Sequence, residues 1–94
     1  MFTYITKGVK YNIPDSIINF IFKMVDKIEK IYLDYLQIFT IQRTPNMGVL
    51  IEHKQEQPKF ESFYFLLNDE INFEGKLYMI IENEYRTLML AEEY

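Results

Sequence analysis

The spacing of apolar residues predicts one long helix near the start of the chain. Between residues 14 and 32, apolar side chains recur every three or four positions, as on one face of an α-helix, at Ile17, Ile21, Met24, Val25, Ile28 and Tyr32. Asn12 is a residue type that caps helix starts, and Pro14 suits the first turn because its missing N–H needs no partner there. We therefore expect an amphipathic helix over residues 14–32, and we interpret Ile18, Phe20 and Phe22 as a widening of its core face.

The rest of the chain has the composition of β-strands. β-branched and aromatic residues predict a first strand over residues 2–7, which Gly8 would end. Five more runs after Asp34 predict strands over residues 35–43, 49–56, 60–67, 76–82 and 85–91. Turn residues separate these runs, among them Pro58, which cannot donate to a β-ladder, and Asn83, which tolerates a left-handed backbone.

This order of elements predicts an α+β fold in a single domain over residues 1–94. One N-terminal amphipathic helix would pack on a mostly antiparallel sheet, in the order β-α-β-β-β-β-β, and the short connections favour a meander. Several strands are apolar on both faces, as in 76–82, whereas one helix covers one face of an open sheet. Two interpretations stay open: the sheet curls into a partial barrel, or a second subunit or partner covers its other face.

The amino-acid composition indicates which kinds of site are absent and which cellular compartment to expect. The chain has no cysteine, which excludes disulfides, thiolate nucleophiles and cysteine-ligated metal sites. The first residues carry neither the basic nor the long apolar part of a signal peptide, and no run of residues is long and apolar enough to span a membrane. We expect a cytoplasmic protein with no membrane contact.

Charge is divided unevenly along the chain. Residues 1–59 carry eight Lys or Arg against six Asp or Glu, whereas residues 60–94 carry two against eight, which gives net charges of +2 and −6. An acidic C-terminal third argues against direct binding of nucleic acid, which requires clustered Lys and Arg. It suits a protein partner with a basic surface.

The residues that carry enzyme chemistry are sparse. His53 is the one histidine, and it lies in a predicted strand with Glu52 and Lys54 on the opposite face, so we expect a structural or surface role for it. Acidic pairs such as Glu92-Glu93 lack the spacing of a calcium loop, and the three glycines stand too far apart for a phosphate loop. Most aromatic residues are expected in the core. We expect no catalytic residue, no metal and no cofactor.

Several motifs of the chain resemble a family of small proteins of unknown function from low-G+C Gram-positive bacteria and their phages and mobile elements. They are Asp-Tyr-Leu-Gln at 34–37, His-x-Gln-Glu-x-Pro at 53–58 and Ala-Glu-Glu-Tyr at 91–94, together with Tyr-Ile-Thr-Lys-Gly-Val at 4–9. The resemblance spans nearly the whole chain. It implies a one-domain cytoplasmic protein and a mobile-element setting, and it implies no catalytic residues.

These observations favour a non-enzymatic binding protein, encoded by a phage or mobile element, that inhibits or modulates a host nucleic-acid-processing machine. A CRISPR effector is the specific partner to test, which would make the protein an anti-CRISPR protein. Its acidic end would meet the basic partner through Glu82, Glu84, Tyr85, Glu92, Glu93 and Tyr94. Two alternatives remain: a self-associating structural or regulatory protein, such as a homodimer, and an enzyme centred on His53 with Glu56 or Glu52.

Overall fold

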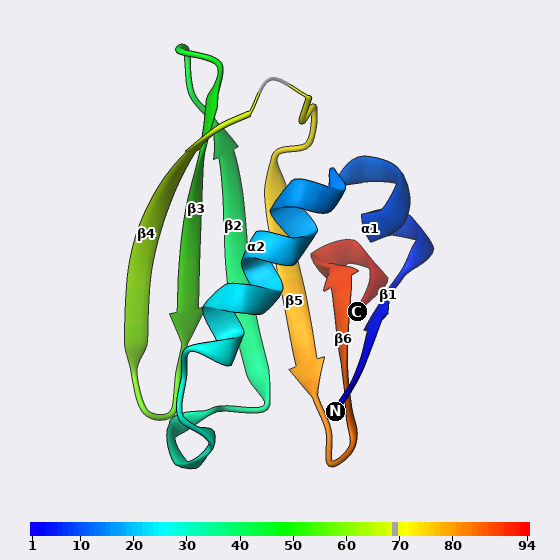
Figure 1. Ribbon diagram of the computed structural model, residues 1–94, viewed down its shortest axis with the longest axis vertical. Helices are drawn as coiled ribbons and strands as arrows, with labels where there is room; N and C mark the ends of the chain where they lie inside the picture. The colour runs from blue at the N-terminus through cyan, green and yellow to red at the C-terminus, as the bar shows by residue number, and fades with distance from the viewer. Residues whose placement is uncertain (69) are drawn as a thin grey trace.

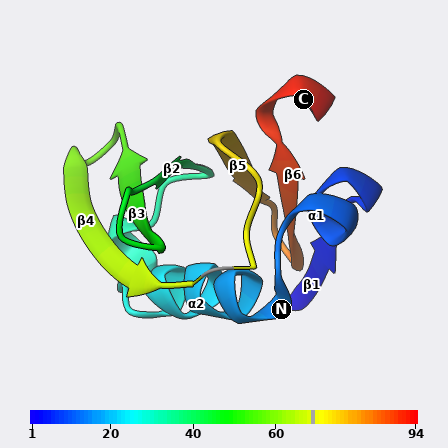
Figure 2. The same ribbon diagram turned by 90° about the horizontal axis from the view of Figure 1, so that it is seen from above.

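A six-stranded sheet curls around one long helix in the computed structural model, which describes residues 1–68 and 70–94 (Figures 1 and 2). The strands are β1 (Phe2–Ile5), β2 (Leu36–Arg43), β3 (Gly48–Gln55), β4 (Phe60–Leu67), β5 (Gly75–Ile81) and β6 (Tyr85–Leu90). The predicted α+β class is confirmed, and the five later strands lie within one residue of their predicted bounds. Asp69, part of the predicted acidic third, lies outside the described residues.

The strand order is β1-β6-β5-β2-β3-β4, which differs from a simple meander. β2, β3 and β4 follow one another in space, but β5 then pairs with the far side of β2 instead of with β4. All of these pairings and β5–β6 are antiparallel, whereas β1 joins β6 in parallel. The return of β5 to the centre leaves β4 as one edge of the sheet and β1 as the other.

The long helix, α2 (Asp15–Asp26), is shorter than predicted at both ends. Asn12 is not its cap: Pro14 holds the N-cap position, without a side-chain hydrogen bond. After α2 the chain enters a short 3₁₀ turn, η1 (Lys30–Tyr32), and the carbonyl of Tyr32 accepts a hydrogen bond from Gln55 on β3. The prediction of a helix to residue 32 was wrong because this tertiary contact redirects the chain towards β2.

A second helix, α1 (Lys7–Asn12), occupies residues that were predicted as strand end and turn. Thr6 caps it, since the Thr6 hydroxyl accepts a hydrogen bond from the N–H of Val9 at 3.3 Å. Asn12 lies in its last turn and donates to the carbonyl of Gly8. β1 therefore ends at Ile5, and Gly8 lies inside a helix instead of ending a strand.

The core lies between α2 and the inner, concave face of the sheet, as Figure 2 shows. α2 contributes Ile17, Ile18, Ile21, Phe22, Met24 and Val25, and the strands contribute Phe39, Ile41, Val49, Ile51, Leu77, Met79, Leu88 and Leu90. The sheet is curled, which is one of the two interpretations that its apolar strands left open. Closure is not observed among the described residues, because β1 and β4 are the ends of the strand order. Both edges of the sheet therefore remain open.

Candidate functional site

The six residues predicted to bind a partner form two groups at opposite ends of β6 (Figure 1). A six-residue strand separates them by roughly 20 Å. The first group lies in the β5–β6 hairpin and comprises Glu82, Glu84 and Tyr85. The second lies in and after the C-terminal 3₁₀ turn η2 (Ala91–Glu93) and comprises Glu92, Glu93 and Tyr94. The structure thus brings together three predicted residues at each end, and not all six.

The hairpin group gains two aromatic neighbours from β1. The parallel register places Phe2 beside Tyr85, and the ring of Tyr4 meets that of Tyr85 edge-on at 5.9 Å between centroids. All three rings lie on the outer face, with exposed fractions of 67 % for Phe2, 53 % for Tyr4 and 43 % for Tyr85. The expectation that most aromatic residues lie in the core was wrong for Phe2 and Tyr4, whereas Tyr85 was predicted to bind a partner. The sequence gives no signal for this cluster, because it depends on pairing between the two ends of the chain.

Carboxylates lie next to these aromatic rings. Glu82 and Glu84 stand in the hairpin, and the N–H of Phe2 donates to the carbonyl of Glu84 at 2.8 Å, which ties β1 to the hairpin. A hydrogen bond from the Tyr85 hydroxyl to Glu82, together with the negative charge of that carboxylate, raises the pKa of Tyr85. We call Phe2, Tyr4, Glu82, Glu84 and Tyr85 the aromatic–acidic edge. It is a surface of exposed rings bordered by negative charge.

In the C-terminal group, Glu93 is engaged within the protein, whereas Glu92 is exposed and Tyr94 is 73 % exposed. The Glu93 carboxylate accepts hydrogen bonds from the Thr6 hydroxyl at 2.6 Å, the Leu90 N–H at 2.8 Å and the Gly8 N–H at 3.2 Å. The Thr6 bond contributes most to lowering the pKa of Glu93, with further contributions from the Leu90 and Gly8 N–H groups. A Cβ at Gly8 would lie 2.6 Å from the carboxylate, so a larger residue there would displace the Glu93 side chain. Glu93 therefore fastens the C-terminus to the start of α1.

Buried polar residues form a second connected cluster, on the inner face of β2 and β3. Two main-chain carbonyls, of Tyr32 and Pro58, accept hydrogen bonds from the Gln55 amide nitrogen. The Gln55 oxygen must then accept from the amide nitrogen of Gln37, at 2.7 Å. The Gln37 oxygen in turn faces Nε2 of His53 at 2.7 Å, so Nε2 carries the proton and donates it. Each orientation in this Gln55–Gln37–His53 chain follows from the one before.

His53 is held as a neutral, buried ring. It is 1 % exposed, stacks on Phe39 at 4.4 Å and meets Phe60 edge-on at 5.2 Å. Burial lowers the pKa of His53 from 6.5 to about 4. Its other nitrogen, Nδ1, has no hydrogen-bond partner among the described residues. Glu52, which an enzyme centred on His53 would use, lies on the opposite face of β3, so the structure does not bring the two side chains together.

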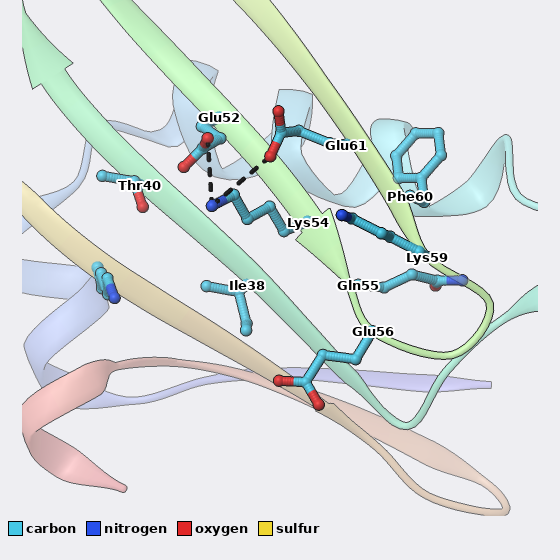
Figure 3. A pocket seen from close by; sticks show the side chains of 10 residues that line it. Ile38, Thr40, Glu52, Lys54, Gln55, Glu56, Lys59, Phe60 and Glu61 are labelled. Atoms are coloured by element: carbon cyan, nitrogen blue, oxygen red, sulfur yellow. Dashed lines mark ion pairs between the residues drawn. The ribbon is translucent and has the colours of Figure 1, made fainter.

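An open pocket lies on the outer face of β2, β3 and β4, and Figure 3 shows its lining side chains. It measures about 430 Å³ and contains three lysines and three glutamates. Lys54 lies between Glu52 and Glu61, at 3.5 and 3.6 Å. Such partly exposed ion pairs exchange readily with water. Balanced charges give this pocket no preference for an anion or a cation.

The motifs that carry the family resemblance meet in two hydrogen-bonded clusters, the buried Gln55–Gln37–His53 chain and the contacts of Glu93. Asp34-Tyr35-Leu36-Gln37 and the stretch from His53 to Pro58 join in the buried cluster, where Asp34 also accepts a hydrogen bond from the N–H of Gln57 at 3.1 Å. The motif at residues 4–9 joins the C-terminal Ala-Glu-Glu-Tyr motif through Glu93. Their roles in this structure are to fix loops and chain ends.

Metal-binding clusters and membrane-spanning helices are both absent from the part of the chain that the structure describes. In the residues 1–68 and 70–94, no cluster of three or more His, Cys, Asp or Glu side chains is placed to hold a metal ion. Within the same ranges, no helix has the length and apolar character needed to cross a membrane.

Comparison with known proteins places the chain in a family. No curated protein matches it. The structure is similar to a crystal structure of a protein of unknown function from Enterococcus faecalis, with a TM-score of 0.78 and 19 % identity, over 99 % of this chain and 90 % of that chain. At this identity the similarity concerns the fold alone. The sequence profile of DUF960, described as staphylococcal protein of unknown function, matches residues 3–93, and the chain therefore belongs to the DUF960 family.

Proposed function

We propose that this protein is a non-enzymatic binding protein, and that its aromatic–acidic edge docks on a basic surface of a partner protein. The observation that carries the proposal is the exposure of Phe2, Tyr4 and Tyr85 together on one face, beside Glu82 and Glu84. Exposed aromatic rings that are grouped together, instead of scattered, mark interaction sites. His53, by contrast, is sealed in the interior and already hydrogen-bonded.

The two kinds of side chain on this edge would have different tasks in binding. Aromatic rings provide most of the binding energy of protein interfaces when they become buried at the centre. Carboxylates at the rim speed encounter with a positively charged surface and fix the orientation of the complex. The ring of Tyr85 lies next to the ring of Tyr4 and to Glu82, and these neighbours pre-position it for binding. A partner with a basic groove would complement both features.

Within this class, we propose a nucleic-acid-processing host protein as the partner, bound in the cytoplasm by a protein of phage or mobile-element origin. Surfaces that bind nucleic acid are rich in Lys and Arg, and an acidic protein that covers them would inhibit the machine. The net charge of −4 and the position of Glu82 and Glu84 support this proposal. A CRISPR effector is the specific case, which would make the protein an anti-CRISPR inhibitor.

The test is a comparison of charge-reversal variants. Tagged wild-type protein and the Glu82→Lys/Glu84→Lys variant are used to capture partners from a nuclease-treated lysate of the host, with quantitative mass spectrometry. We expect a nucleic-acid-processing protein whose recovery falls on the order of tenfold or more in the variant, and more steeply at low salt. Glu93 is left unchanged because its carboxylate holds the fold together.

The matched control is Glu56→Lys/Glu70→Lys, which changes the net charge equally at two exposed carboxylates outside the hairpin and the C-terminal group. It is expected to capture the partner as well as the wild type does. Equal recovery with the Glu82→Lys/Glu84→Lys variant would overturn the assignment of this edge. Loss of the partner with the control alone would place the binding surface outside the hairpin.

A further inference from the structure

The edge strand β4 exposes a continuous row of large apolar side chains. On its outer face, the exposed fractions are 55 % for Phe63, 53 % for Phe65 and 79 % for Leu67, and Met47 of the neighbouring hairpin adds a side chain that is 64 % exposed. Natural proteins protect long edge strands with prolines, lysines or bulges, because an open edge pairs with other chains. β4 has eight residues, pairs with β3 in unbroken register and contains neither proline nor lysine. Its edge is therefore unprotected.

The hydrogen-bonding phase of β4 shows which of its main-chain groups are free. The N–H of Asn68 donates to the carbonyl of Met47 at 3.1 Å. These two residues are the next pair along the ladder after Gly48 and Leu67, which face each other. In an antiparallel ladder this marks Gly48 and Leu67 as a non-hydrogen-bonded pair, and the pairs alternate from there. The residues whose N–H and C=O groups point away from β3 are therefore Glu61, Phe63, Phe65 and Leu67. The residues with outward apolar side chains are also the ones that offer free main-chain groups.

We propose that β4 pairs in antiparallel fashion with β4 of a second copy of this chain, about a twofold axis at Tyr64. This register places Phe63 opposite Phe65 of the partner subunit, and Glu61 opposite Leu67 of the partner subunit. All four outward-facing residues then find main-chain partners, and two aromatic cross-strand pairs form on the outer face. The two sheets become one continuous sheet.

The absence of charged side chains on this part of β4 favours a second copy of the chain as its partner. Each chain carries a net charge of −4, so two copies repel each other wherever charged surfaces meet. Residues 62–68 contain no charged side chain, which makes this stretch a place where two acidic copies can approach closely. A basic partner protein, in contrast, would find no carboxylate here beyond Glu61, which already contacts Lys54.

The area is also sufficient for a dimer. Side chains of this size and exposure each contribute roughly 100 Å² that pairing would bury. Met47, Phe63, Phe65 and Leu67 from both copies, with the strand edges themselves, bring the total to roughly 1,000 Å², the lower limit for specific interfaces. This pairing is independent of the aromatic–acidic edge, which lies at the other end of the strand order.

Light scattering coupled to size exclusion tests the proposal. We expect the wild type to have twice the chain mass of 11.5 kDa. The Phe63→Lys/Leu67→Lys variant is expected at the mass of one chain, since paired strands would then place buried lysines at the new interface. The matched control is Tyr11→Lys, because Tyr11 is 81 % exposed and lies in α1, beside β6 at the other end of the strand order. It should remain a dimer.

Amide hydrogen exchange provides a second measurement that does not depend on these variants. In the wild-type dimer, the amides of Phe63, Phe65 and Leu67 should be protected, although they point away from β3, and dilution to monomer should release them. A wild-type monomer at every concentration would overturn the proposal, as would a dimer whose β4 amides exchange freely. β4 amides that become protected only when a partner protein is added would assign the edge to that partner instead. The oligomeric state and the exchange of the β4 amides do not change what the Glu82→Lys/Glu84→Lys variant tests.

Discussion

The two faces of β3 carry polar residues of opposite character. On the inner face, His53 and Gln55 are buried and linked through Gln37 by neutral, directional hydrogen bonds. On the outer face, Glu52 and Lys54 form partly exposed ion pairs. A buried polar group left without its partner is costly, whereas an exposed ion pair competes with water. We therefore expect the inner polar residues to contribute more to the stability of the fold than the outer ones.

The largest expected effect comes from removing the centre of the inner cluster. Gln37→Ala leaves His53 Nε2, the Gln55 oxygen and the Asp34 carbonyl without the hydrogen bonds that they make to Gln37. We expect the free energy of unfolding to fall by about 2–4 kcal/mol, measured by urea denaturation. The control is Gln42→Ala, an exposed glutamine of the same strand, with an expected change within about 0.5 kcal/mol. Equal losses of unfolding free energy in the two variants would show that the inner cluster stabilises the protein no more than an exposed glutamine does.

The second expected effect is a loss of stability in acid that depends on His53. The folded protein holds the pKa of His53 at about 4, below its ordinary value of 6.5, because the charged ring is disfavoured by burial. Its contribution is therefore complete above pH 6.5. It falls as the pH drops from 6.5 to 4, because the unfolded chain then binds a proton that the folded chain does not. The slope should reach at most about 1.4 kcal/mol per pH unit.

Denaturation curves between pH 7 and pH 4 measure this dependence. His53→Gln keeps an N–H donor that can reach Gln37 but does not titrate. This variant should lose the part of the slope that lies between pH 6.5 and 4. An identical slope in wild type and variant would contradict the assignment of that part to His53.

A smaller effect is expected at the C-terminal contact. Glu93→Gln replaces one of the two accepting oxygens by an NH2 group, which cannot accept, so the hydrogen bonds of Thr6, Gly8 and Leu90 cannot all be kept. The expected loss of unfolding free energy is about 0.5–1.5 kcal/mol, since the site is exposed. Glu92→Gln, which neutralises the neighbouring exposed carboxylate, is the control and should have almost no effect. If the two variants behave alike, the Glu93 contacts do not stabilise the protein.

The smallest effect is expected on the outer face of β3. Lys54→Ala removes the ion pairs to Glu52 and Glu61, whose side chains and that of Lys54 are between 23 % and 46 % exposed. We expect a loss of about 0.2–1 kcal/mol that decreases further at high salt. A loss as large as that of Gln37→Ala would erase the contrast between the two faces.

The parts of this fold that could be predicted from the sequence are those with local signals. Alternating apolar residues and turn residues located the five later strands, and the period of the apolar residues located α2. α1 was missed because a hydrogen bond from its Gly8 N–H to distant Glu93 supports its start, and because Gly8 has the appearance of a strand breaker. The end of α2 was misplaced because the contact between Tyr32 and Gln55 is tertiary. Local patterns contain no information about either contact.

The candidate site was predictable only in part, for the same reason. The acidic hairpin is visible in the sequence, and Glu82, Glu84 and Tyr85 remain together in the structure. Phe2 and Tyr4 could not be assigned to them, because the parallel pairing of β1 with β6 joins residues 83 positions apart, as in Phe2 and Tyr85. The exposed row on β4 belongs to a strand that was predicted within its observed bounds, but its place at an edge depends on the return of β5 to β2.

We propose that the outer edges of the sheet bind partners while its inner face stabilises the fold. The most direct test measures both properties in Tyr4→Ala/Tyr85→Ala, with Tyr11→Ala/Tyr35→Ala as the control pair of exposed tyrosines elsewhere. We predict that the aromatic-edge variant loses capture of the partner while its unfolding free energy falls by about 1 kcal/mol or less, and that the control retains both. Full capture of the partner by a clearly destabilised Tyr4→Ala/Tyr85→Ala variant would contradict the claim.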